Sequence, residues 1–131
     1  MAEGYQDLIA WRKAIQLALE VYRCTKAFPK EELYGLTSQM RRAAVSVASN
    51  IAEGKGRYSR REFVQFLYCA RGSLLELQTQ LFLARELEYL QSNVSRRIKD
   101  EADELGRILN GLTTSVLKSS PQISCERRAK N

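Results

Sequence analysis

A chain of 131 residues is long enough for one domain with a hydrophobic core and too short for two. Its hydrophobic content of 44% argues against a disordered chain, and only 2 prolines and 7 glycines leave few of the breaks that strands need. The formal net charge of +6 favours an anionic partner such as a nucleic acid.

The N-terminus and the cysteines indicate a cellular compartment. Residues 1–5 have no basic stretch followed by an apolar one, which argues against a secretory signal. No apolar run reaches the roughly 18 residues that a membrane-spanning helix needs. We therefore expect a cytoplasmic protein with no membrane partner. Cys24, Cys69 and Cys125 are odd in number and widely spaced, which favours two buried thiols and one tail thiol over disulfides.

The first predicted helix begins after Asp7, a candidate N-cap, and ends before Pro29, because the residue before a proline disfavours helical geometry. Residues 28–35 are expected to form a loop with a short turn of its own. One face of this helix is apolar at helical spacing and consists of Leu8, Trp11, Ile15, Ala18, Tyr22 and Thr25.

The second predicted helix runs from Thr37 to Glu53, and Gly54 is expected to end it in the left-handed conformation. Its apolar face consists of Met40, Ala43, Ala44, Val47, Ala48 and Ile51. Most of these residues are small, so neighbouring helix axes can approach closely. We expect this helix to be central and tightly packed.

The third predicted helix starts at Ser59, and Glu62 completes a capping box with it. Its core face consists of Phe63, Leu67, Ala70, Leu74, Leu77, Leu81 and Ala84. A second apolar stripe repeats every seven residues and consists of Tyr68, Leu75, Phe82 and Tyr89. Two stripes allow the helix to face its own bundle and another subunit, or both stripes lie in one wide core. Periodicity alone favours neither arrangement.

The fourth predicted helix has Ser92 as its cap and an apolar face of Val94, Ile98, Ala102, Leu105, Leu109, Leu112 and Val116. From Ser119 the pattern stops. We predict an all-α fold, an antiparallel up-down-up-down four-helix bundle over residues 1–118, followed by a basic, disordered tail over residues 119–131.

Catalytic and metal-binding patterns are missing from the sequence. The chain has no histidine, which removes the commonest general base and a frequent metal ligand. It has no cysteine cluster for zinc and no glycine-rich phosphate loop after a strand. We therefore predict a non-enzymatic protein without cofactor or metal. Catalysis by carboxylates alone is the remaining alternative, and no residue points to it.

Three polar residues share one face of the second predicted helix: Ser46, Asn50 and Glu53. Their expected partners on the third helix are Glu76, Thr79 and Gln80, and Arg42 or Arg71 could neutralise Glu53. A buried hydrogen-bonded network that fixes the register of the helices is the favoured interpretation, and a ligand pocket is the alternative.

Basic residues gather between positions 37 and 62, where Arg41, Arg42, Lys55, Arg57, Arg60 and Arg61 face only two carboxylates, Glu53 and Glu62. Arginines in the first turn of a helix oppose its macrodipole, so they do not stabilise it locally. Their guanidinium groups suit phosphate oxygens, and Tyr58 could stack on an exposed base. An ordinary solvated charge patch is the alternative to a nucleic-acid site.

Several ordered stretches resemble a bacterial four-helix-bundle family whose founding members are encoded within intervening sequences of 23S ribosomal RNA genes. The stretches are 8–14, 34–44, 49–54 and 70–77, together with Glu62-Phe63 and Phe66-Leu67. The resemblance covers roughly residues 5–115. The sequence is also similar to the accessory variability proteins of diversity-generating retroelements. In those systems a basic pentamer binds RNA and a reverse transcriptase.

The resemblance implies a homopentamer, a ring around a central channel, and no enzyme activity. It makes Tyr68, Leu75 and Phe82 candidates for the subunit interface and the basic cluster a candidate for nucleic-acid contact. Two hypotheses follow. The first is an oligomer that binds structured RNA, another polyanion or an RNA–protein complex. The second is a protein–protein scaffold with no nucleic-acid role.

Overall fold

The computed structural model describes residues 4–119, which form four α-helices and two short 3-10 turns and contain no strand. The helices are α1 (Ile9–Thr25), α2 (Leu36–Lys55), α3 (Arg60–Glu86) and α4 (Ser92–Lys118), and the turns are η1 (Tyr5–Asp7) and η2 (Lys30–Glu32). The predicted all-α class is confirmed. The predicted tail, apart from Ser119, lies outside the described residues.

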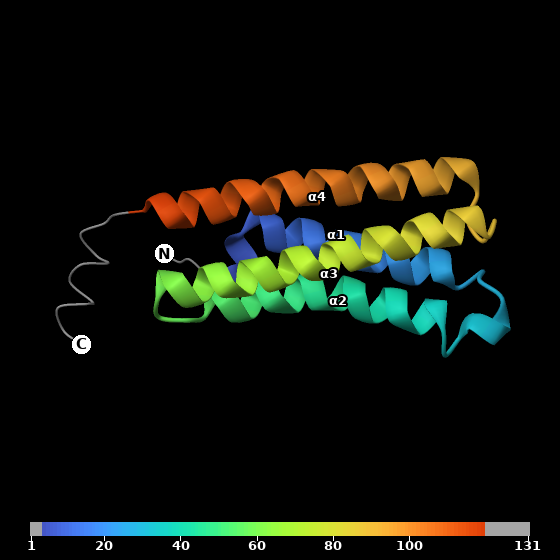
Figure 1. Cartoon of the computed structure of the whole chain (residues 1–131), viewed down its shortest axis with the longest axis horizontal. Coiled ribbons are helices and arrows are strands. Elements are labelled where there is room, and N and C mark those ends of the chain that lie inside the picture. Colours follow the sequence, from blue (N-terminus) through green and yellow to red (C-terminus); the bar gives the residue numbers. More distant parts are fainter. Residues whose placement is uncertain (1–3, 120–131) are drawn as a thin grey trace.

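The four helices pack side by side, and their connections alternate between the two ends of the molecule (Figure 1). α2 packs against α1 and α3, and α4 completes the arrangement by packing against α3 and α1. The connection between α2 and α3 lies at the same end as the last turn of α4. Residues far apart in the sequence therefore meet at this end.

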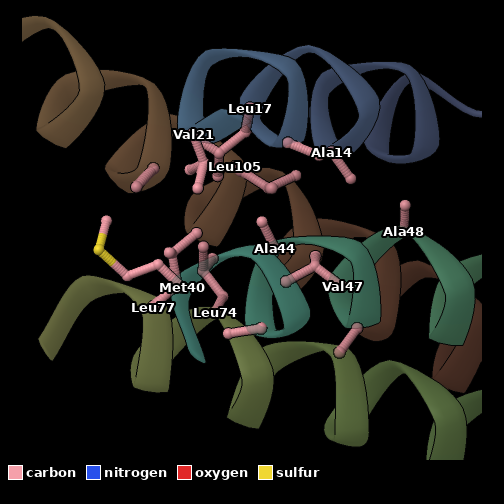
Figure 2. Close-up of a cluster of buried hydrophobic side chains, with 14 of the residues drawn as sticks. Ala14, Leu17, Val21, Met40, Ala44, Val47, Ala48, Leu74, Leu77 and Leu105 are labelled. Atoms are coloured by element: carbon pink, nitrogen blue, oxygen red, sulfur yellow. The ribbon is translucent and has the colours of Figure 1, made fainter. Parts of the chain in front are cut away.

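One core runs through the molecule, and all four helices contribute to it. Figure 2 shows Leu17 and Val21 of α1, Met40 of α2, Leu77 of α3 and Leu105 of α4 meeting in its centre. Alanines line the seam between α1 and α2, where a narrow side chain lets two helices approach closely. All six residues of the predicted α2 face are buried, which confirms the central position expected for this helix.

The predicted face of α1 was only partly correct. Its buried residues are Ala10, Ala14, Leu17, Ala18, Val21 and Thr25. Of these six, only Ala18 and Thr25 belong to the predicted face. Tyr22 is exposed, and Trp11 and Ile15 flank the core. The small alanines occupy the tight contact with α2, and the bulky side chains cover its edges. A pattern that scores large apolar residues highest therefore centred the face on the wrong residues.

Two predicted helix caps were wrong and one was right. α1 begins after Leu8 and α4 after Gln91, and neither N-cap makes a side-chain hydrogen bond, so Asp7 and Ser92 do not have the predicted positions. The hydroxyl of Ser59 accepts from the backbone N–H of Glu62 at 3.0 Å, as the capping box predicts. Within residues 4–119 the reciprocal bond, from the backbone N–H of Ser59 to the Glu62 carboxylate, does not form.

Gly54 is not the left-handed stop that the sequence suggested. The helix continues to Lys55, and Gly56 follows it with a right-handed φ of −79°. Gly54 is buried, and a Cβ placed on it would lie 2.7 Å from the Cβ of Phe66 on α3. Glycine is needed here because α2 and α3 approach closely, and its freedom to adopt a positive φ is not used.

Tyr89 does not belong to the second stripe of α3, because the helix ends at Glu86 and Glu88 takes a φ of +65°. Its ring packs against Phe28, with 5.2 Å between centroids, and its hydroxyl donates to Glu32 at 2.9 Å. Glu32 also accepts from the N–H of Leu36 at 3.0 Å, so it caps α2 from the preceding turn. These hydrogen bonds hold the pKa of Glu32 below its ordinary value.

Candidate nucleic-acid interface

The predicted basic cluster divides into two groups along α2. Arg41 and Arg42 lie near its start, and Lys55 is its last residue. Fourteen residues of α-helix span about 20 Å, so these two groups face different surroundings. Lys55 lies with Arg57, Arg60 and Arg61 at the connection between α2 and α3. Figure 1 shows this connection at one end of the bundle.

Arg41 connects two helices. Its Nε donates to the buried hydroxyl of Thr25 at 2.9 Å, and its guanidinium lies over the ring of Tyr22 at 4.8 Å from the centroid. Both partners belong to α1. The side chain is half-buried, so this arginine stabilises the contact between α1 and α2. Its guanidinium is engaged within the protein.

Arg42 is exposed on the side of the bundle. It lines a shallow depression between α2 and α3 together with Gln39, Ala43, Ser46 and Glu76. The carboxylate of Glu76 makes this depression a poor place for a phosphate, because like charges repel. Arg42 is therefore the weakest member of the predicted nucleic-acid set.

Lys55 and Arg57 are supported by aromatic rings of α3. The guanidinium of Arg57 lies 4.7 Å from the ring centroid of Phe66, and the ammonium of Lys55 lies 5.9 Å from that of Phe63. A cation over a ring face is held electrostatically while its charge remains available to a second partner. A carboxylate in the same place would neutralise it. The sequence pattern assigned Phe63 to the core and gave no role to Phe66.

Arg60 binds the end of α4. Its Nη1 donates to the Ser119 hydroxyl at 2.8 Å, to the Ser119 carbonyl and to the Val116 carbonyl at 3.4 Å. A cation at the carbonyl end of a helix is favoured by the macrodipole. Arg60 thus compensates the end of a neighbouring helix, although it opposes the dipole of its own. This part of its guanidinium is engaged within the chain.

Arg61 is exposed in the first turn of α3, and Tyr58 before it is 98% exposed. Lys118, the last residue of α4, is exposed at the same end of the bundle. We call the five cations Lys55, Arg57, Arg60, Arg61 and Lys118 the basic end. Two exposed carboxylates, Glu53 and Glu62, lie near it in sequence. The basic end therefore has an excess of positive charge.

Ion pairs of the described chain lie away from the basic end. They are Lys13–Glu104, Arg23–Glu20, Arg97–Glu20, Arg85–Glu86 and Lys99–Asp103. Within residues 4–119, no carboxylate pairs with Lys55, Arg57 or Arg61. Five cations of residues 4–119 are therefore paired with a carboxylate, and Lys55, Arg57 and Arg61 are among those that are not.

The predicted polar network exists in a smaller form. Ser46 and Ser73 share a hydrogen bond of 2.8 Å between α2 and α3, and the amide of Asn50 donates to the Ser46 hydroxyl at 3.0 Å and to its carbonyl at 2.9 Å. Glu53 is exposed and takes no part. The partner is Ser73, where Glu76, Thr79 and Gln80 had been expected. Two small hydroxyls fit between closely packed helices, and a carboxylate does not.

The second stripe of α3 points to solvent at three of its four predicted positions. Tyr68, Leu75 and Phe82 are 49%, 54% and 55% exposed. The alternative of one wide internal core is therefore wrong for these residues. A small pocket lies beside Phe82, between α3 and α4, and a shallow groove beside Tyr68 runs to Val116 and Leu117 of α4.

The structure describes two of the three cysteines, Cys24 and Cys69. Cys69 is exposed on α3, which corrects the expectation of a buried thiol. Cys24 is half-buried, and burial raises its pKa to about 11, so it is a poor nucleophile. Cys125 lies outside the described residues. Across residues 4–119, no group of three or more His, Cys, Asp or Glu side chains could hold a metal ion.

A comparison with known protein families shows to which family the chain is related. The sequence profile of the 23S rRNA-intervening sequence proteins matches residues 6–111. The chain belongs to this family. The match covers most of the four helices and ends within α4, before the last turns that Arg60 contacts. A search of curated proteins finds no significant similarity.

A solved structure is similar to this member of the 23S rRNA-intervening sequence family. It is a protein with unknown function from the S23 ribosomal protein family of Bacteroides thetaiotaomicron, with a TM-score of 0.75 and 21% identity. The similarity covers 81% of this chain and 96% of that one. At this identity it shows the shared fold. None of the helices in residues 4–119 is both long and apolar enough to cross a membrane.

Proposed function

We propose that this chain is a non-enzymatic, oligomeric binding protein that holds structured RNA, or an RNA–protein complex, at its basic end. One observation carries the proposal. Lys55, Arg57 and Arg61 lie at the connection between α2 and α3, and no carboxylate in residues 4–119 pairs with them. The family description refers to the intervening sequences of 23S rRNA, so the choice of a nucleic-acid ligand rests on the charge of the basic end.

Phosphate oxygens fit this arrangement. A guanidinium presents several N–H donors in a fixed fork, and it binds phosphate more strongly than a neutral donor does. Arg57 is already positioned by Phe66, so less side-chain freedom is lost when it binds. Each neutralised phosphate releases condensed counterions, which makes the affinity depend steeply on salt.

The exposed stripe supports the oligomeric part of the proposal. Tyr68, Leu75 and Phe82 form one apolar line on α3, and Gly72 lies among them with open space where a Cβ would be. A glycine inside a long helix is unfavourable by about 1 kcal/mol relative to alanine, and it lets a second helix approach. We propose that a second copy of the chain covers this line, in a homopentameric ring of up-down-up-down bundles.

An oligomer would strengthen the RNA proposal through multivalency. Each copy brings one basic end, and a ring would present these ends together on one rim. A polyanion bound by one end then meets the others at a high effective concentration, so overall affinity exceeds that of a single site. The charge of each end also adds to the field of its neighbours.

RNA binding is tested by a salt titration with a labelled structured RNA and a DNA duplex of equal length. We expect log K to fall steeply with log[salt], and the double variant Arg57→Ala/Arg61→Ala to reduce the slope by about 1.5. The control is Arg96→Ala/Arg107→Ala, which removes two exposed arginines of α4. Equal losses in the two double variants would reject the basic end as the site.

Assembly is tested by the molar mass in solution. The substitutions Leu75→Glu and Phe82→Glu place charges on the stripe and should give smaller particles than the unmodified protein. Leu33→Glu is the control, because Leu33 is about as exposed but lies next to η2, between α1 and α2. A mass that stays the same in the stripe variant would place the subunit contact elsewhere.

A protein–protein scaffold is the second candidate function, and the stripe favours it. An apolar line and the pocket beside Phe82 suit a protein surface better than an RNA backbone. Affinity capture after nuclease treatment separates the two functions. A partner protein that remains bound, together with no RNA affinity at low salt, would favour the scaffold.

A further inference from the structure

Tyr58 occupies an unusual place at the basic end. Its ring is 98% exposed in the short connection between α2 and α3, between Arg57 and the capping residue Ser59. It contributes no burial to the core, and leaving such a ring in water is unfavourable. Helix formation does not require it either, because Ser59 provides the cap of α3.

The surroundings of this ring are positive. Arg57 precedes it and is held over Phe66, and Arg61 follows it on the first exposed turn of α3. Tyr34 offers a comparison, since it is 93% exposed near the opposite end of the bundle. It follows Lys30, Glu31 and Glu32, so charges of both signs lie near it in sequence. Of these two exposed tyrosines, Tyr58 is the one that lies between arginines.

We propose that Tyr58 stacks on an unpaired base whose flanking phosphates are held by Arg57 and Arg61. This inference rests on the proposed function and specifies its ligand as a strand with at least one unstacked nucleotide. An aromatic face binds the π-face of any base without reading its sequence. A duplex hides these faces in its own stack, so a loop, bulge or single strand is required.

Affinity measurements test the assignment on the full chain. The probes are a labelled RNA stem–loop, a DNA hairpin of the same sequence, and a blunt RNA duplex with the same number of phosphates. We expect Tyr58→Ala to weaken binding to the stem–loop by roughly tenfold and to leave duplex binding unchanged. Tyr58→Phe keeps the aromatic face and should bind as the unmodified protein does. Tyr34→Ala is the matched control and should have no effect.

Two features distinguish stacking from loss of charge. Tyr58→Ala removes no charge, so the slope of log K against log[salt] should stay the same while the affinity falls. A loss on both RNA and DNA loops supports stacking on any unpaired strand, and a loss on RNA alone assigns the site to RNA. If Tyr58→Ala binds the stem–loop within twofold of the unmodified protein, the inference is wrong and RNA binding stands. If the unmodified protein binds no probe, the proposed function fails.

A spectroscopic reading reports the stack directly. The chain has a single tryptophan, Trp11, so Tyr58→Trp in a Trp11→Phe background places one indole at the tip of the connection. Stacking on a base should quench its fluorescence when the stem–loop is added, and the blunt duplex should quench it much less. Equal emission with and without the stem–loop, at saturating concentration, would overturn the assignment.

Discussion

The Arg60 guanidinium of α3 donates a hydrogen bond to the Ser119 hydroxyl at the end of α4, with 2.8 Å between Nη1 and Oγ. The same nitrogen also contacts the Val116 carbonyl at 3.4 Å. A side chain in the first turn of α3 therefore caps the last turn of α4. The sequence places Arg60 in the predicted binding cluster. Its contacts show that it also helps to hold α3 and α4 together.

Replacing Arg60 by alanine should destabilise the protein. The carbonyls at the end of α4 lose their cation, and we expect the free energy of unfolding to fall by about 1 kcal/mol, because charge-assisted bonds at a partly exposed site are worth that much. Hydrogen exchange should quicken in the last turn of α4. Urea unfolding and exchange measurements check both effects.

Arg61→Ala is the control for this effect, since Arg61 is exposed one residue further on. It should change stability by no more than about 0.5 kcal/mol and should weaken RNA binding more than Arg60→Ala does. If Arg60→Ala left stability unchanged and reduced RNA affinity as strongly as Arg61→Ala, Arg60 would be a binding residue.

Gly54→Ala should destabilise the contact between α2 and α3. The new Cβ would lie 2.7 Å from the Cβ of Phe66 and 3.0 Å from Cδ1 of Phe63, so the two helices must separate. Overpacking costs about 1–3 kcal/mol and alanine returns about 1 kcal/mol of helix propensity, which leaves a net loss of up to about 2 kcal/mol. Denaturant unfolding measures it.

Gly111→Ala is the matched substitution on α4, where a Cβ meets nothing within 4 Å. There only the gain in helix propensity remains, so stability should rise by up to about 1 kcal/mol. Equal behaviour of the two variants would show that the approach of α2 and α3 does not depend on glycine.

The cap of α2 should make stability depend on pH in the acid range. Because Glu32 has a lowered pKa in the folded protein, its carboxylate stabilises the fold above the ordinary glutamate pKa of 4.5, and this contribution is lost as the pH falls through the folded value. Glu32→Gln should have a lower Tm than the unmodified protein at pH 7, and the difference should shrink below pH 4.5.

Glu31→Gln provides the control for this experiment, because it removes the same charge and leaves the bonds from Leu36 and Tyr89 in place. Its Tm at pH 7 should lie closer to that of the unmodified protein. A Tm difference for Glu32→Gln that is constant from pH 7 to pH 3 would contradict the role of the charged carboxylate.

The two described cysteines should differ in reactivity. Burial raises the pKa of Cys24 to about 11, so only roughly one part in a thousand is thiolate at pH 8. Iodoacetamide should modify Cys69, which is exposed, at least roughly a hundred times faster than Cys24. Peptide mapping by mass spectrometry gives both rates, and urea should bring them together. Fast modification of Cys24 in the folded protein would show that its site opens.

Helical periodicity was enough to predict the four helices and most of the core, because a buried line of apolar residues is needed wherever two helices pack. It failed where the packing itself decides the outcome. Gly54 was assigned to a stop because a helix end and a close helix contact both select glycine. Tyr89 fitted a seven-residue repeat, although the chain had already left the helix and turned back onto Phe28.

The sequence identified most of the cations of the candidate site, but it did not predict which of them lie together. Nearness in sequence grouped Arg41 with Arg57, although an α-helix separates them by its length. The rings under Lys55 and Arg57 belong to α3 beyond a turn, and no periodicity relates residues on opposite sides of a turn. The contact of Arg60 is still more distant, since its partner lies 59 residues further along the chain.

Lys55 and Arg57 rest on phenylalanine rings, so no group that titrates near neutral pH holds them in place. The chain contains no histidine, the side chain whose charge most often changes between pH 5 and pH 8. A phosphate ligand held by these cations would be insensitive to moderate acidification. Salt would weaken its binding instead, because dissolved cations compete with these side chains for the phosphates of the ligand.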